Sequence, residues 1–315
     1  MSINKPLRAL LFLFFFILAI KLSLNPLAAY IAQRKLKNIF VDSRVSIGSC
    51  QVRPLSSIKF LNVELVREPL YDLKLKEIDI RYSPVSIMKG GIPRVSLRDA
   101  SAVINTKQEG ILIENVSLDT GGRGAADRLS IERIKYNEIK AEDIQSRIAL
   151  TQGSLSFGAI AGRIMDGKFT GDVSISLTPG FAYTVNLALD GLDIASFIRD
   201  AGLKEKFVMT GKFGGSILLK GNGPRISILG GDLLAAQPGG TLTIKDNEYL
   251  KSIAEAQKVP VELLVESFNE YQYNIGKLSL KKQGESLILE IALEGTTGKR
   301  NLTVVVHDFS WLKPA

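Results

Sequence analysis

The sequence has few of the residues that build most reactive sites. Its 315 residues include one cysteine, Cys50, and one histidine, His307. A single cysteine excludes an internal disulfide and any cysteine cluster around zinc or iron–sulfur. A single histidine excludes a histidine-rich metal centre, and any histidine-dependent nucleophile would have to use His307. We therefore expect no metal site and no cofactor.

Motifs for catalysis and phosphate binding are also absent from the sequence. The glycine-containing stretches 221–224 and 239–241 match neither a Walker loop nor a dinucleotide-binding loop, and there is no G-x-S-x-G motif. Both stretches precede strand-like sequence, so turns are the better interpretation. With no set of nucleophile, base and oxyanion donors, the sequence predicts a protein that is not an enzyme.

The positive charge is confined to the amino-terminal part of the chain. The formal net charge is +8, and residues 1–60 account for all of it, because Asp42 is their only acidic residue. The rest of the chain is charge-balanced and mixes acidic with basic residues. This pattern lacks the basic stripe with aromatic residues that nucleic-acid binding requires, so we expect no nucleic-acid partner.

The amino terminus has the pattern of a membrane segment. Two cations precede an unbroken apolar run from Ala9 to Ile20, and apolar character resumes after Lys21. As a helix, Ala9 to Ile31 would rise about 34 Å, enough to span a bilayer. No cleavage site with small residues at both required positions is present, which favours an uncleaved signal anchor over residues 1–32, with a removed signal peptide as the alternative. We expect the cations around it to meet lipid headgroups: Lys21, Arg34, Lys35 and Lys37.

From Val45 onward the sequence predicts mostly β-strands. Apolar and polar residues alternate with period two over many short segments, and glycine or proline separates them. In residues 73–82 the alternation changes phase between Leu75 and Ile78, as expected at a bulge. Short strands at even spacing indicate an antiparallel meander. Helical spacing is limited to 193–199, 247–257 and 261–271, with 27–40 as an amphipathic continuation of the anchor.

An all-β chain of this kind must cover its apolar face. A closed barrel or sandwich would fill it with side chains, whereas a long sheet curled into a gutter would leave it open to a ligand. Acyl chains would suit such a groove on a membrane-anchored protein. Sequence periodicity is compatible with both arrangements.

Several segments resemble the AsmA-like envelope proteins. The amino-terminal resemblance lies in Val45–Gly48, Ser57–Leu65 and Ile78–Pro84, and Gly211–Pro224 is similar to a strand-then-turn pattern of that group. The carboxy-terminal third resembles the YdbH branch, whose domain carries an older dicarboxylate-transport label. That similarity rests on Pro238–Ile244, Phe268–Tyr273, Leu287–Gly295 and Arg300–Leu302.

The resemblance implies a fold and a function. The fold is mainly β: a membrane-anchor helix (1–32), then an elongated antiparallel sheet curled into a groove, like a taco, with a few short helices. The groove would comprise an amino-terminal segment (33–120) and a YdbH-like domain (125–315). The protein would sit in the bacterial inner membrane as a single-pass protein with its body in the periplasm. It would bind phospholipid and conduct it between the inner and outer membranes, with an outer-membrane protein or lipoprotein as a possible partner.

The candidate lipid-binding residues are the apolar positions of the alternating strands. They are Val185, Leu187, Leu189, Ile217, Leu219, Ile226, Ile228, Leu242, Ile244, Leu278, Leu280, Leu287, Leu289, Ile291 and Leu293. Each position also fits an ordinary core residue. The alternative function is a non-catalytic scaffold for envelope assembly, acting through exposed strand edges.

Overall fold

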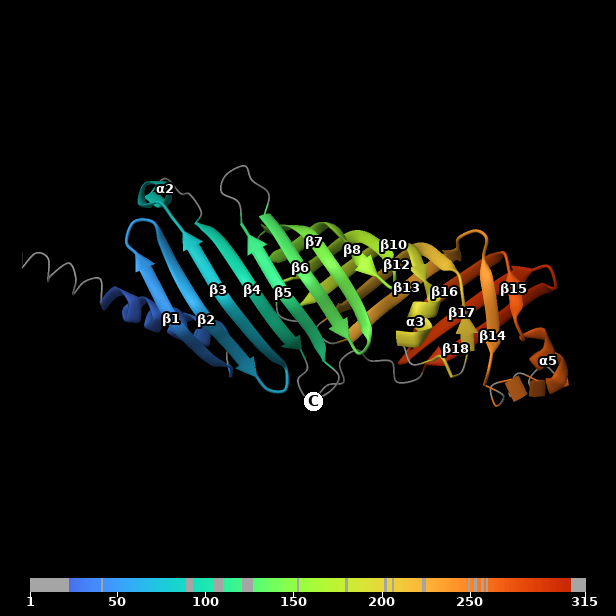
Figure 1. Cartoon of the computed structure of the whole chain (residues 1–315). Coiled ribbons are helices and arrows are strands. Elements are labelled where there is room, and N and C mark those ends of the chain that lie inside the picture. Colours follow the sequence, from blue (N-terminus) through green and yellow to red (C-terminus); the bar gives the residue numbers. More distant parts are fainter. Residues whose placement is uncertain are drawn as a thin grey trace, which may run out of the picture. The chain divides into compact units, whose positions relative to one another are not determined.

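The computed structural model of the chain is mainly β, as predicted (Figure 1). It describes residues 23–306, apart from 41, 89–92, 105–109, 121–126, 152, 179–180, 201–202, 206, 223–224, 247, 249, 252–253, 256–257 and 259. Fifteen strands form one antiparallel sheet in chain order, and three strands form a small second sheet. The chain divides into two compact units, residues 1–131 and 132–315.

The first unit is a meander in which each strand pairs with the next. Its strands are β1 (Arg44–Arg53), β2 (Ser57–Arg67), β3 (Tyr71–Arg81), β4 (Arg94–Ile104) and β5 (Ile111–Asp119), with helix α2 (Pro84–Met88) between β3 and β4. Strand β6 (Asp127–Tyr136) contains the boundary between the units. Figure 1 shows α2 beyond the end of β3.

The phase change predicted near Leu75 is present in four neighbouring strands at the same row. In β3, Leu73 and Leu75 share the apolar face with Ile78 and Ile80, and Lys76 and Glu77 lie between the two pairs. The register from β1 to β4 has no shift, because every strand changes phase together. Asn62 and Asp99 adopt positive φ angles of 53° and 50° in this row. We call this row, 48–49, 61–62, 76–77 and 98–99, the crease.

A helix over residues 23–39 covers the apolar face of β1 to β3. Ala28, Ala29, Ala32 and Leu36 pack against a buried cluster of Cys50, Phe60 and Val63. The small alanine side chains let the helix approach the sheet closely. Two hydrogen bonds fix it: the Val52 amide donates to Asn25 Oδ1 (2.8 Å) and Gln33 Nε2 donates to the Val45 carbonyl (2.8 Å).

This packing changes the interpretation of the expected anchor, residues 1–32. Residues 1–22 lie outside the described part of the chain, and residues 23–32 belong to a helix that continues to residue 39. Among the described residues, no helix has the length and apolar character needed to cross a membrane. The apolar residues of 23–32 are therefore divided between a face packed on the sheet and an exposed face.

The second unit continues the meander and adds a small sheet. Its main strands are β7 (Ile139–Thr151), β8 (Ser154–Ile164), β9 (Gly167–Ser176), β10 (Ala182–Asp193), β12 (Lys212–Asn222), β13 (Arg225–Ala235), β16 (Ile275–Gln283), β17 (Ser286–Gly295) and β18 (Gly298–Val306). The small sheet has the order β11 (Phe207–Met209), β14 (Gly240–Ile244) and β15 (Tyr271–Tyr273).

Two helices accompany these strands. Helix α3 (Ile194–Asp200) confirms the helix predicted at 193–199. Helix α5 (Val261–Ser267) is shorter than the predicted 261–271, because the chain leaves the helix at Phe268 and Tyr271 begins a strand. The described positions of 247–257 are helical only at 248, 250–251 and 254–255.

The small sheet contributes several buried side chains to the core of the second unit, including Met209, Leu242 and Tyr271. Tyr273 of β15 lies beside Phe213 of β12, with ring centroids 6.4 Å apart, and Phe213 is completely buried. The Tyr273 hydroxyl donates to the Thr210 carbonyl. One margin of the main sheet is thus covered by side chains of the small sheet.

Candidate lipid-binding face

Twelve of the fifteen candidate residues lie on one face of the second unit. In an antiparallel sheet, directly paired residues point to the same side. The pairing joins a central row across seven strands: Gly171, Leu187, Ile217, Gly231, Leu280, Leu289 and Val304. Residues two or four positions away along each strand share that side. They add Val185, Leu189, Leu219, Leu278, Leu287, Ile291 and Leu293, and Ile226 joins them after a register shift.

Burial differs sharply between the rows of this apolar face. The row beside the small sheet is largely buried: Leu189, Leu233, Leu278 and Leu302 expose 8% or less of their surface. The residues of the central row are only half-buried. No described element therefore fully covers the central row, and the apolar face is a filled core at one margin and a partly open surface further along the strands.

Three candidate residues lie elsewhere. Ile228 pairs with Lys220, on the opposite side of the sheet from Leu219, and is 46% exposed. The register shift at Lys220 and Gly221 moves Ile228 to the polar side and leaves Ile226 on the apolar side. Leu242 and Ile244 belong to the small sheet, where both are buried.

Two glycines of the central row were not identified from the sequence. A Cβ atom on Gly231 would lie 3.1 Å from Ile217 Cγ1 and 2.6 Å from the Ser216 carbonyl oxygen. On Gly171 it would lie 3.0 Å from Leu187 Cδ2. Neighbouring apolar side chains therefore occupy the space above both glycines. The available signal was glycine inside a strand, which often marks a close approach.

The opposite face of these strands is polar. Asn186 Nδ2 donates to Asp172 Oδ2 (2.9 Å), and Ser279 Oγ donates to Asp232 Oδ1 (2.6 Å). Hydrogen bonds from Ser279 and Lys277 lower the pKa of the Asp232 carboxyl. A hollow of about 660 Å³ lies along these strands, and its lining combines polar residues such as Ser216 and Glu290 with the central-row residues Leu187, Ile217 and Leu280. The two faces thus differ in polarity.

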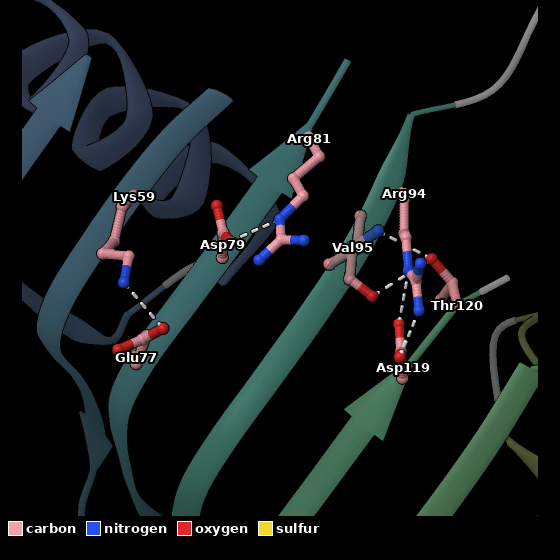
Figure 2. A network of polar contacts seen from close by, with 8 residues as sticks. All are labelled: Lys59, Glu77, Asp79, Arg81, Arg94, Val95, Asp119 and Thr120. Atoms are coloured by element: carbon pink, nitrogen blue, oxygen red, sulfur yellow. Dashed lines mark hydrogen bonds and ion pairs between the residues drawn. The ribbon is translucent and has the colours of Figure 1, made fainter. Parts of the chain in front are cut away.

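The first unit has the same division into an apolar and a polar face. On the polar face, Lys59 Nζ donates to Glu77 Oε1 (2.9 Å) and Arg81 Nε donates to Asp79 Oδ2 (2.9 Å). Figure 2 shows these ion pairs on β2 and β3, and the pairing of Arg94 with Asp119 beside them.

The Arg94–Asp119 ion pair joins the first residue of β4 to the last residue of β5. Arg94 Nε donates to Asp119 Oδ1 at 2.8 Å, and its second nitrogen reaches Asp119 Oδ2. This hydrogen bonding lowers the pKa of the Asp119 carboxyl. The Val95 amide donates to Thr120 Oγ1 (2.7 Å), and the hydroxyl in turn donates to the Val95 carbonyl. These contacts are structural: they complete the sheet pairing beyond the last strand residue.

The cations expected at lipid headgroups are placed only in part. Arg34, Lys35 and Lys37 lie in the helix 23–39 and are exposed. Lys21 lies outside the described residues. Leu27, Tyr30 and Ile31 are also exposed, at 50% or more. The helix therefore carries an outward surface that is apolar in its first turns and basic in its later turns.

The described residues contain no cluster of metal-ligating side chains. In that part of the chain no three His, Cys, Asp or Glu side chains gather closely enough to hold a metal ion. Cys50 is buried beneath the helix 23–39, and burial raises the pKa of its thiol. His307 lies outside the described residues.

Comparison with known proteins identifies the family. No curated protein and no solved structure matches the chain. A family model does match: the YdbH-like family, described as "Intermembrane phospholipid transport protein YdbH", over residues 93–274. The match covers more than half of the chain and includes strands of both units together with the small sheet. The chain belongs to the YdbH-like family.

Proposed function

We propose that this protein binds phospholipid along the apolar face and conducts it between two membranes. The observation that carries the proposal is the half-buried central row, which is apolar and continuous over seven strands. Each methylene group held in water costs about 0.8 kcal/mol, so an acyl chain gains free energy wherever such a row replaces water. The headgroup would remain in solvent beyond the apolar rows.

The family description supports phospholipid as the cargo. A lipid route also needs contact with a bilayer, and the apolar run from Ala9 to Ile20 is the segment we assign to it. The exposed Arg34, Lys35 and Lys37 would then meet phosphate groups. In this proposal the amino terminus sits in the bacterial inner membrane and the sheet extends into the periplasm.

Photocrosslinking tests the lipid contact. A photoreactive residue is placed at Leu219 or Leu289, which are half-buried on the apolar face. The matched control is Ile228, an exposed residue of the polar face. The full-length chain is expected to capture phospholipid from Leu219 and Leu289 and none from Ile228. Equal capture at all three positions, or none at any, would contradict binding to the apolar face.

Charge substitution tests conduction. Leu289→Asp removes an apolar contact of about 1.5–3 kcal/mol with an acyl chain, equal to about a tenfold or larger loss of occupancy. We expect transfer of a fluorescent phospholipid between vesicles to fall by about that factor while the fold persists, because Leu289 is half-buried.

Two further variants separate transport from folding. Ile228→Asp should leave transfer unchanged, since Ile228 lies on the polar face and is exposed. Leu278→Asp should unfold the second unit, because Leu278 is buried beside the small sheet. If Leu289→Asp unfolds the protein as Leu278→Asp does, Leu289 is a core residue and the proposed route is wrong there.

The second candidate function is an assembly scaffold. The observation that favours it is strand β18, which among the described strands pairs only with β17 and carries an exposed Val305. An unpaired strand edge can add a strand from a partner. Capture of protein but not lipid by the residues tested above would favour this function over conduction.

A further inference from the structure

We propose that one end of the first unit contacts the bilayer directly, through four apolar side chains at the strand ends. They are Leu55, in the turn between β1 and β2, and Val85, Ile87 and Met88 of α2, and we call them the apolar tip. Their exposed fractions are 77%, 61%, 48% and 88%. Single exposed apolar residues are ordinary on a protein surface, whereas several on adjacent connections mark an interaction site.

The two connections lie at the same end of the sheet. Arg53 pairs with Ser57, and Ser57 pairs with Arg81, so β1 ends where β3 ends. The Tyr82 amide donates to the Ser56 carbonyl at 2.8 Å, which joins the turn to the segment leading into α2. The turn that carries Leu55 and the segment that leads into α2 are therefore adjacent at this end of the sheet.

The helix 23–39 begins at this same end of the sheet. The Val52 amide donates to Asn25 Oδ1, so the first turn of the helix 23–39 lies beside the last residues of β1. The amino-terminal run ends at Ile20, three residues before Ser23, and three residues reach at most about 11 Å. The inference rests on the proposed insertion of this run, because the inserted run places the bilayer at the tip.

The outward face of the helix has the matching polarity. Leu27, Tyr30 and Ile31 are exposed in its first turns, and Arg34 and Lys37 follow. At 1.5 Å per residue, Leu27 lies about 6 Å along the axis from Ser23, and Lys37 about 21 Å. Along the helix, apolar side chains come first and cationic side chains follow. A bilayer has the matching order, with its apolar interior first and its phosphate headgroups further out.

Three arginines surround the tip. Arg53, Arg81 and Arg94 stand at the ends of β1 and β3 and the start of β4, and all three are exposed. Arg81 and Arg94 already bind Asp79 and Asp119 (Figure 2). A guanidinium has five N–H donors, so both retain donors for a lipid phosphate. This arrangement favours a bilayer surface over a purely apolar protein partner.

The experiment measures the depth of single fluorescent labels in the full-length chain. Met88→Cys and Leu55→Cys are made in a Cys50→Ala background, labelled with an environment-sensitive dye and reconstituted in phosphatidylglycerol-containing vesicles. Ile228→Cys, exposed on the polar face of the second unit, is the matched control. We expect spin-labelled acyl chains to quench the labels at Met88 and Leu55, and aqueous iodide to quench the label at Ile228.

The outcomes separate this inference from the proposed function. Flotation of the protein with the vesicles reports insertion of the amino-terminal run independently of the labels. If the protein floats but iodide alone quenches Met88 and Leu55, the tip does not enter the bilayer and the inference is overturned. Energy transfer between tip labels on different chains, without quenching by lipid, would assign the tip to a second copy and also overturn it.

Discussion

At the scale of single residues, Tyr273 shows how the second unit secures its core. Its hydroxyl donates to the Thr210 carbonyl, and its ring lies beside the fully buried Phe213. Burial raises the pKa of Tyr273 well above its ordinary value. A phenol that must stay neutral in the folded state couples folding to pH, because the unfolded chain ionises first.

The coupling predicts a pH dependence with a definite sign. The stability due to a neutral Tyr273 is complete below about pH 10 and declines as the pH rises above that value. At neutral pH, Tyr273→Phe should lower the free energy of unfolding by about 1 kcal/mol through loss of the hydrogen bond. Above pH 10 the difference between the two proteins should shrink, as measured by urea unfolding at a series of pH values.

Tyr183 and Tyr271 serve as internal controls for this experiment. Burial raises the pKa of both, but they are present in the wild type and in Tyr273→Phe alike and cancel in the difference. A constant difference in unfolding free energy from pH 8 to pH 12 would contradict the assigned role of Tyr273.

At the scale of elements, the helix 23–39 acts as a cover for the first three strands. Its position depends on two hydrogen bonds with the sheet backbone, one accepted by the Asn25 side chain and one donated by the Gln33 side chain. Asn25→Ala leaves the Val52 amide without this acceptor, and we expect a loss of about 1 kcal/mol in the free energy of unfolding. Hydrogen exchange should accelerate at the Val52 amide and along the first turns of the helix.

Asn38→Ala is the matched control, because Asn38 is exposed near the other end of the same helix. It should leave both measurements at their wild-type values. Exchange that is unchanged at Val52 in Asn25→Ala would mean that alanine packing alone holds the helix on the sheet.

The strands and the apolar face were largely predictable from the sequence, and specific physical effects explain the misses. Period-two alternation identified the strands and placed Leu187, Leu219 and Leu289 on a common face. It failed for Ile228, because a register shift at the turn reverses the side and no local signal marks it. It also missed β7, whose alternation is interrupted by register shifts between Glu142 and Arg147, and β11 and β15, which with three residues each are too short to show a period.

The small sheet could not be predicted from the sequence for a different reason. Leu242 and Ile244 alternate like residues of the main sheet, but their partners, Phe207 and Tyr271 among them, are distant in the chain. Local alternation contains no information about which strands pair across such distances. Local sequence also failed to reveal the packing partners of Ala28 and Ala32. Their apolar character indicated a membrane segment, but both pack against the core cluster of the first unit.

At the scale of the whole molecule, the extent of the apolar face sets how much lipid the proposed binding surface could hold. Neighbouring strands lie about 4.8 Å apart, so the nine main strands of the second unit extend roughly 38 Å across. The first unit has an apolar face of its own beyond the part under the helix, on β4 and β5. We expect the full-length chain to bind more than one phospholipid, as counted by native mass spectrometry.

A double variant checks where those lipids bind. Leu219→Asp with Leu289→Asp places two charges in the half-buried rows of the second unit and should lower the lipid count without abolishing it, because the first unit is unchanged. The Ile228→Asp variant should keep the wild-type count. A wild-type stoichiometry of one lipid per chain, unaffected by the double variant, would exclude extended binding along the sheet.

The crease across β1 to β4 also has a consequence for how the sheet finds its correct alignment. A plain meander can slip by two residues and still present the same side chains to the same face. In this sheet such a slip would set the left-handed residues Asn62 and Asp99 opposite regular strand positions and would put the phase changes of neighbours out of line. Only the native register places the phase changes of neighbouring strands side by side. The crease therefore favours the native register in each of the three strand pairs from β1 to β4.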